Sequence, residues 1–310
     1  MKSQTRMLLA LTCAGLMSAA HAGSVKTSDD DVYKPTGKGV GELDAAATEA
    51  VHNGLTKSGG GGANGISYHG GPLITSVSGV NVYYIFYGSW TSNQQALLTS
   101  LMMGLGGTPI FNINTSYYDG SKRRVVNAVT LKGQANDNYS LGKSLSDANI
   151  QTIVANQIQA GALPSDTNGV YFVLTAPDVA ETSGFGSQYC GWHTHGTIGG
   201  ADIKYAFVGN ATTIAPSGCG VNNPSPNGDG GIDGMASVIY HELSEASTDP
   251  DLNAWYDRRG QENADKCAWT FGTTFKTSNG ATANNTFGGK NWLLQQNWVN
   301  ASGGYCTLSY

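Results

Sequence analysis

The sequence feature that most constrains the fold is one helix that is apolar along one side and carries acidic side chains on another. Asp233 is a suitable N-cap residue, and Pro250 predicts that the helix ends near Thr248. The apolar stripe consists of Met235, Ile239, Leu243 and Ala246. Because these residues recur at helical spacing, the stripe has to pack against a sheet or another helix. The sequence therefore predicts that this helix lies in the core of a globular domain.

Other strands and helices are expected upstream of this helix. Three stretches rich in β-branched and aromatic side chains predict buried strands at residues 79–88, 169–177 and 204–211. Thr91 followed by Gln94 forms a capping box, which predicts a helix through about Leu105. Another helix is expected to begin at Ser146 and to end at Gly161. The pattern predicts a single α/β (α+β) domain with a mixed, twisted sheet.

Residues 1–22 have the pattern of a secretory signal peptide. Lys2 and Arg6 give a positive start, residues 7–19 form an apolar run, and residues 20–22 form an A-x-A cleavage site. No later stretch approaches the roughly 18 consecutive apolar residues that a membrane-spanning helix requires. We therefore expect a chain that is exported to the extracellular space or the periplasm.

The remainder of the chain divides into two parts by composition. Residues 23–65 are polar and end in a glycine run, which predicts a flexible leader or propeptide with one short helix near Glu42–Leu55. From residue 66 to residue 310 the composition is that of one globular domain.

The net charge argues against two classes of partner. Loss of residues 1–22 removes two of the 17 Lys and Arg residues and none of the 22 Asp and Glu residues, so the charge becomes 15 − 22 = −7. An acidic surface disfavours nucleic acid and anionic lipid. We expect no nucleic acid and no membrane as partners, which leaves peptides and cell-wall glycans as the ligands to consider.

Cysteine usage predicts disulfide-stapled loops. The predicted mature chain contains Cys190, Cys219, Cys267 and Cys306. An even number of cysteines in an exported chain indicates disulfides, and four cysteines allow three connectivities. We favour Cys190–Cys219 and Cys267–Cys306, because each bridge then stays within one region. No C-x-x-C pair is present, so a cysteine-bound metal is disfavoured.

The acidic face of the central helix carries the most specific chemical pattern. His241 and Glu245 are four residues apart, so both side chains project from one face. The letters HELSE differ by one from HExxH, in which two histidines bind zinc and the first Glu activates water. Glu245 preserves the spacing and supplies a permitted oxygen ligand, and its charge also suits other divalent cations. By this pattern His241 and Glu245 are metal ligands and Glu242 is the general base.

A metal site of this type needs a third ligand. Glu262 and Asp265 form an E-x-x-D pattern that starts 17 residues after Glu245, an order similar to that of thermolysin-like zinc peptidases. We select Glu262 as the third ligand. Four other residues remain alternatives to it besides Asp265: Asp249, Asp251, His193 and His195. His193 and His195 are two apart, so in a strand they would share one face.

Two interpretations without a metal compete with this one. A His–Glu pair at this spacing is also typical of a buried hydrogen-bonded network. Paired carboxylates could instead cleave glycosides, with Trp255, Tyr256 and Trp269 as surfaces on which a sugar stacks. The sequence contains no G-x-S-x-G nucleophile elbow and no phosphate-binding loop.

Several segments together resemble the EXORDIUM-like, or phosphate-induced protein, family of secreted plant proteins. The matching stretches are YHGGPLI, VNVYYIFYGSW, CGWH, YAFVGNA, PNGDGGIDGMASVIYHELSEASTDPDLNAWYD and ENADKC. The resemblance implies an extracellular or cell-wall location, and the family's biochemical activity is poorly defined. The family's His-Glu-x-x-Glu motif coincides with His241, Glu242 and Glu245, and its E-x-A-D-x-C motif includes Glu262 and Asp265.

Besides the glycan-cleaving enzyme that would use the acidic cluster without a metal, these observations give two functional hypotheses. The first is a secreted, zincin-like metallohydrolase, in which His241, Glu245 and Glu262 hold zinc or another divalent cation and Glu242 is the general base. In that case the strand at residues 204–210 would lie at the edge of the cleft and pair with a peptide substrate. The second is a non-catalytic protein of the cell wall, or one that binds glycans, with a structural His–Glu network.

Overall fold

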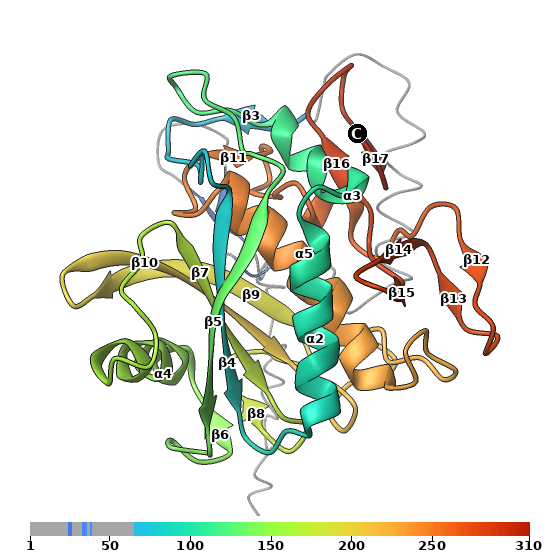
Figure 1. The fold of residues 1–310 in the computed structure, drawn as a ribbon. Helices are drawn as coiled ribbons and strands as arrows, with labels where there is room; N and C mark the ends of the chain where they lie inside the picture. Colours follow the sequence, from blue (N-terminus) through green and yellow to red (C-terminus); the bar gives the residue numbers. More distant parts are fainter. Residues whose placement is uncertain (1–23, 27–32, 36–37, 39–64) are drawn as a thin grey trace, which may run out of the picture.

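The computed structural model describes residues 24–26, 33–35, 38 and 65–310, and the predicted signal peptide and short helix near Glu42–Leu55 lie outside these residues (Figure 1). Strands β1 (Ser24–Lys26) and β2 (Tyr33–Pro35) pair with each other in antiparallel fashion. The Nζ atom of Lys38 donates hydrogen bonds to Asp147 (2.7 Å) and Ser183 (3.0 Å). The segment predicted to be a flexible leader therefore includes a residue that the globular domain holds.

A five-stranded sheet forms the centre of the domain. Its strand order is β5-β4-β7-β10-β9. The strands are β4 (Val80–Tyr87), β5 (Val129–Asp137), β7 (Gly169–Thr175), β9 (Gly191–Ile198) and β10 (Ala201–Gly209). Neighbouring strands are parallel except for β9, which runs antiparallel to β10. The predicted α/β class with a mixed sheet is confirmed.

The position of the edge strand differs from the prediction. The strand expected at residues 204–211 corresponds to β10, which lies inside the sheet between β7 and β9. Gly199 and Gly200 turn the chain with φ values of +60° and +84°, so that β9 folds back along β10 as a hairpin. The edge strand on this side of the sheet is consequently β9, and the expectation that residues 204–210 form an edge strand is wrong.

Helices lie on both faces of this sheet (Figure 1). Helix α2 (Ser92–Leu105) has the predicted capping box of Thr91 with Gln94, and α4 (Asp147–Gln159) begins after its predicted cap, Ser146. A short helix α3 (Pro109–Asn112) and the 3₁₀ turn η1 (Ile113–Ser116) follow α2. In Figure 1, α2 and α5 lie together on one side of the sheet and α4 lies on the other.

The central helix predicted from the sequence is α5 (Gly230–Thr248). Its N-cap is Asp229, whose side chain accepts a hydrogen bond from the backbone of Ile232, so the predicted cap at Asp233 is wrong by one turn. Gly230 and Gly231, the first two residues of α5, are typical of a loop. The structure nevertheless requires a glycine at position 231. A Cβ atom at this position would lie 2.5 Å from Oδ1 of Asn210. Every residue from Gly231 to Thr248 is buried, as predicted for a core helix.

The remaining strands are short and lie outside the main sheet. They are β3 (Ser67–Tyr68), β6 (Ser144–Leu145), β8 (Ala180–Glu181), β11 (Trp255–Tyr256), β12 (Phe275–Lys276), β13 (Thr282–Ala283), β14 (Asn285–Phe287), β15 (Lys290–Trp292), β16 (Asn297–Val299) and β17 (Tyr305–Thr307), with a 3₁₀ turn η2 (Asp265–Cys267). Both predicted disulfides, Cys190–Cys219 and Cys267–Cys306, are present. Cys190–Cys219 joins the residue before β9 to the loop that precedes α5, and Cys267–Cys306 joins η2 to β17.

In the part of the chain that the structure describes, no single helix has the length and apolar character of a membrane span. Helix α2 and the segment Pro109–Ser116 satisfy the criterion only as a pair, with a bend of 57° between them.

Candidate metal centre

Six ionisable side chains from three segments meet in the interior of the domain. Helix α5 contributes His241, Glu242 and Glu245, strand β9 contributes His193, and the segment that follows β11 contributes Glu262 and Asp265. None of the six residues is more than 7% exposed. We refer to these six residues as the His–carboxylate cluster.

One half of the cluster is centred on the imidazole of His241. Its Nε2 atom lies 3.1 Å from Oε1 of Glu245 and 3.5 Å from Oδ1 of Asp265. The backbone N–H of Asp265 donates a 2.9 Å hydrogen bond to the same Glu245 oxygen. One ligand atom from each of these three residues lies within 4.8 Å of the other two, which is compatible with a single cation.

The other half is centred on His193. Its Nε2 atom lies 3.2 Å from Oε2 of Glu262 and 3.8 Å from Oε2 of Glu245. His193, Glu242 and Glu245 form another group whose ligand atoms lie within 4.8 Å of one another. Glu245 belongs to both groups, so its carboxylate connects the two imidazoles.

The structure places the predicted site residues as follows. His241 and Glu245 are adjacent, and Glu242 lies on the side of the cluster that faces β9. Glu262, predicted as the third ligand, contacts His193, while Asp265 is the acidic residue of that segment nearest His241. Sequence spacing could not distinguish Glu262 from Asp265, because both belong to the same short segment.

The other residues considered as ligands have different roles. Oδ1 of Asp249 accepts hydrogen bonds of 2.6 Å from the backbone N–H groups of Asn253 and Ala254, which stabilises the turn after α5. His195 lies 2.8 Å from Asp202 in an exposed ion-pair network. Lys204 is in the same network, 2.6 Å from Asp202 and 3.6 Å from Asp251. Because the Lys204 ammonium already offsets part of the charge of these two carboxylates, this network attracts a cation less strongly.

Burial and mutual repulsion determine the ionisation of the cluster. Burial raises the pKa of Glu262 well above its usual value, and the neighbouring carboxylates of Glu245, Asp249, Asp265 and Glu242 raise it further. Burial, followed by the positive charge that His241 can carry, lowers the pKa of His193 to about 3. His193 is therefore a neutral imidazole, which is the form that binds metals.

The chemistry of the donors suits a cation. Oε1 of Glu262 and Oδ1 of Asp265 are buried and accept no hydrogen bond from any residue that the structure describes. Buried carboxylate oxygens rarely lack a partner. Imidazole nitrogen with carboxylate oxygen is a donor set used by zinc and by other first-row divalent metals, and a higher proportion of carboxylates favours harder cations.

A buried amide network that sequence reasoning missed positions the Glu262–Asp265 segment. The Oδ1 atom of Asn114, in η1, accepts hydrogen bonds from the side chains of Asn263 (3.1 Å) and Asn297 (3.2 Å). Its amide nitrogen donates to Ser244 on α5 over 3.4 Å. Asn114 therefore connects the segment to the helix that carries His241. Isolated asparagines carry no sequence signal for such a role.

The conserved-region model of phosphate-induced protein 1 matches residues 66–294, which include all six cluster residues. The chain belongs to the phosphate-induced protein 1 family. It is 31% identical over 281 residues to Protein EXORDIUM-like 3 of Arabidopsis thaliana, an alignment that covers 78% of this chain and 82% of that protein. The family resemblance predicted from the sequence is confirmed.

Other members of the phosphate-induced protein 1 family show a similar degree of identity. Protein EXORDIUM-like 5 of Arabidopsis thaliana is 30% identical, with 75% of each chain covered. Protein PHOSPHATE-INDUCED 1 of Nicotiana tabacum is 28% identical, with 62% of this chain and 67% of that protein covered. No solved structure matches this chain.

Proposed function

We propose that the His–carboxylate cluster is a divalent-cation centre and that it is the functional site of this chain. The observation that carries the proposal is the convergence of four carboxylates and two imidazoles within the buried interior. Burying carboxylates together is unfavourable unless a proton or a cation offsets their charge. A divalent cation would offset two negative charges at once. It would also be coordinated by the oxygens of Glu262 and Asp265 that lack hydrogen bonds.

In this proposal His241 and Glu245 are the central ligands, because they occur together in one of the two groups and Glu245 occurs in both. Asp265 or Glu262 completes the set from the segment after β11. Zinc is the first cation to test. The charge of the carboxylates makes manganese, iron or calcium the alternatives.

The proposed chemistry is hydrolysis in a zincin-like site. A bound cation would supply a Lewis acid that polarises a carbonyl group. Glu242 lies beside His193 and Glu245, where it could accept a proton from water. No described strand pairs with the outer edge of β9, which carries His193, so an extended peptide could add to the sheet there.

A second candidate function is that of a non-catalytic extracellular protein in which the cation is structural. The observation that favours it is the low exposure of the cluster, because structural metal sites are closed whereas catalytic sites keep an open position. Export itself is supported by the pattern of residues 1–22 and by the two disulfides, which persist in oxidising compartments.

A Glu242→Gln variant separates the two functions. The protein is loaded with zinc, and cleavage of a mixture of fluorescence-quenched peptides is measured by the increase in fluorescence. A hydrolase is expected to cleave at least one peptide and to lose about a hundredfold or more of that rate in Glu242→Gln while still binding zinc. Absence of cleavage by zinc-loaded protein supports the structural role.

The first prediction concerns metal content. His241→Ala is expected to reduce bound zinc from about one equivalent to a small fraction of that, because the variant removes the imidazole nitrogen of one ligand group. Inductively coupled plasma mass spectrometry after zinc incubation and desalting measures the content. His195→Ala, a histidine on the same strand as His193 but in the exposed network, is the matched control and should retain zinc. Equal zinc in both variants would argue against the centre.

The second prediction concerns pH. Burial, together with the neighbouring carboxylates, raises the pKa of Glu262, so at mildly acidic pH a cation has to displace a bound proton. The lowered pKa of His193 means that its imidazole does not compete at that pH. The dissociation constant is therefore expected to increase as the pH falls, by up to about tenfold per pH unit for one displaced proton. Isothermal titration calorimetry between about pH 6 and pH 8 tests this, and a constant affinity would contradict it.

A further inference from the structure

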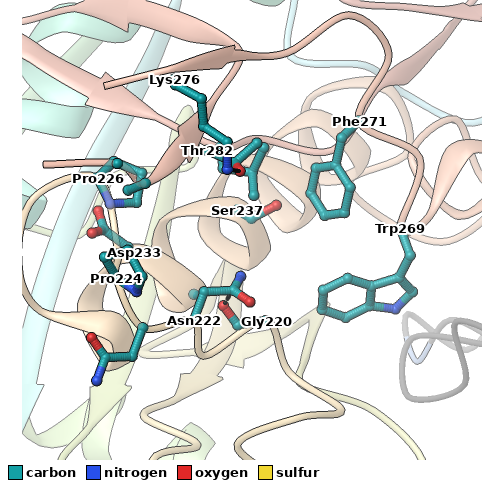
Figure 2. A pocket seen from close by; sticks show the side chains of 15 residues that line it. Gly220, Asn222, Pro224, Pro226, Asp233, Ser237, Trp269, Phe271, Lys276 and Thr282 are labelled. Atoms are coloured by element: carbon teal, nitrogen blue, oxygen red, sulfur yellow. Dashed lines mark hydrogen bonds between the residues drawn. The ribbon is translucent and has the colours of Figure 1, made fainter. Parts of the chain in front are cut away.

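A cavity of about 410 Å³ lies beside the N-terminal half of α5, and none of its lining residues belongs to the His–carboxylate cluster. Its walls come from α5, the loop at residues 220–226, the segment at residues 269–271 and the hairpin β12–β13. The volume falls within the range of about 300–1,000 Å³ that is usual for small-molecule sites. Figure 2 shows the side chains that line it.

One wall of the cavity is aromatic. The rings of Trp269 and Phe271 lie side by side with centroids 6.3 Å apart and planes inclined by 60° (Figure 2). The backbone of Trp269 has a φ of +58°, a left-handed conformation that bulky residues avoid. Its N–H donates to Oε1 of Gln295 over 2.9 Å, and the N–H of Gln295 donates to Ser237 on α5. Strained backbone of this kind is typical of functional sites, and here it fixes the indole on the cavity wall.

The facing wall carries uncharged polar groups. Asn222 lies across the cavity from Trp269 and Phe271 in Figure 2. Asn223 also lines the cavity and is exposed. A primary amide offers donors and an acceptor at once. The carboxylate of Asp233 also lines the cavity, and its two oxygens accept hydrogen bonds from Asn227, at 2.6 and 2.8 Å.

A close glycine–indole contact and the two disulfides hold the two walls of the cavity in place. Gly220 has a φ of +72°, and a Cβ atom there would lie 3.1 Å from Cζ3 of Trp269, so the absence of a side chain lets the indole lie against this loop. Cys219, next to Gly220, is bonded to Cys190, and Cys267, two residues before Trp269, is bonded to Cys306. The cavity is therefore preformed, which reduces the entropy that a ligand must overcome on binding.

We propose that this cavity binds a neutral saccharide. A pyranose ring has an apolar C–H face that complements the electron-rich face of an indole or a phenyl ring. Its hydroxyl groups both donate and accept hydrogen bonds, as do the amides of Asn222 and Asn223 and the hydroxyl of Ser237. Lys276 is the only lysine or arginine among the lining residues, so the cavity lacks the cluster of cations that a uronic acid or a phosphate requires.

The test uses the full chain and four probe sugars. Cellotriose, maltotriose and tri-N-acetylchitotriose are the neutral probes, and trigalacturonate is the anionic one. Binding is followed by tryptophan fluorescence and by isothermal titration calorimetry. At least one neutral probe is expected to bind with a dissociation constant in the millimolar range or below, and trigalacturonate at least about tenfold more weakly.

Two variants assign the binding to this cavity. Trp269→Ala should weaken it about tenfold or more, because the stacking surface is lost. Asn223→Ala removes an exposed amide from the cavity wall, and binding should weaken several-fold. Trp90→Phe, outside the cavity, is the control and should bind as the unaltered chain does. Failure of all neutral probes to bind, or unchanged binding in both cavity variants, would overturn the proposal.

The saccharide proposal is independent of the metal proposal. The cavity contains no residue of the cluster, so protein treated with a chelator and still folded is expected to bind the same sugar with an affinity within about twofold. A loss of sugar binding that follows only the loss of metal would place the sugar at the cluster and contradict the site proposed here.

Discussion

Removing the divalent cation with a chelator is expected to lower the melting temperature of the protein by roughly 5–10 °C. A ligand that binds only the folded state stabilises it by about 2.7 kcal/mol when its free concentration is 100 times its dissociation constant. For a domain of this size, each kcal/mol shifts the melting temperature by about 2–4 °C. The expected shift is large because, without a cation, Glu262 has to remain protonated among four other carboxylates.

Differential scanning fluorimetry with EDTA and with added zinc, manganese or calcium measures this shift. His241→Ala should melt at the same temperature with and without chelator, because it lacks the centre. His195→Ala, the exposed histidine of β9, should respond to EDTA as the unaltered chain does. A chelator response below about 1 °C in the unaltered chain would indicate that the cluster is a protonated hydrogen-bond network and not a cation site.

Removing the Cys267–Cys306 disulfide is expected to reduce the free energy of unfolding by about 4 kcal/mol. The bridge joins residues 39 apart, and the entropy of closing a loop of that length in the unfolded chain gives this value. Because Cys267 ends the η2 turn that begins at Asp265, the variant Cys267→Ala/Cys306→Ala should also weaken cation binding. Guanidinium unfolding in EDTA measures the first effect, and calorimetric titration with zinc measures the second.

The Cys190–Cys219 disulfide provides the matched comparison. It joins residues 29 apart, so its removal should lower stability by a similar amount, about 3.5 kcal/mol. His193 lies three residues after Cys190 but is held by the pairing of β9 with β10, where it is opposite Ala206. Cation affinity is therefore expected to change less than in the Cys267–Cys306 variant. Equal losses of affinity would show that the disulfides act only through overall stability.

Much of the fold could be predicted from the sequence because its signals are local. The capping boxes at Thr91 and Ser146 fix the starts of α2 and α4 through contacts within one helical turn. The continuous apolar run of β4 is typical of a strand covered on both faces. The start of α5 was predicted one turn too late, because the contact that fixes it is long-range. Gly231 is unfavourable in a helix by itself and is required by the distant side chain of Asn210.

The edge of the sheet could not be predicted because strand pairing is a long-range property. The sequence at residues 204–211 has the features of any buried strand, and only the hairpin turn at Gly199 and Gly200 brings β9 to the outside. Because of that turn, β9, the strand that carries His193, and not the segment at residues 204–210, lies at the edge of the sheet.

The sequence by itself determined the pairing of His241 with Glu245, because two residues four apart on a helix project from the same face wherever that helix lies. It also indicated the family, whereas the three possible cysteine pairings were resolved only by the structure. Only the tertiary structure decided that His193 contacts Glu262 and that Asp265 approaches His241, at 3.2 and 3.5 Å. The two residues are 69 positions apart in the first pair and 24 positions apart in the second. Their contacts therefore depend on how β9, α5 and the segment after β11 pack together. No local sequence pattern encodes that packing.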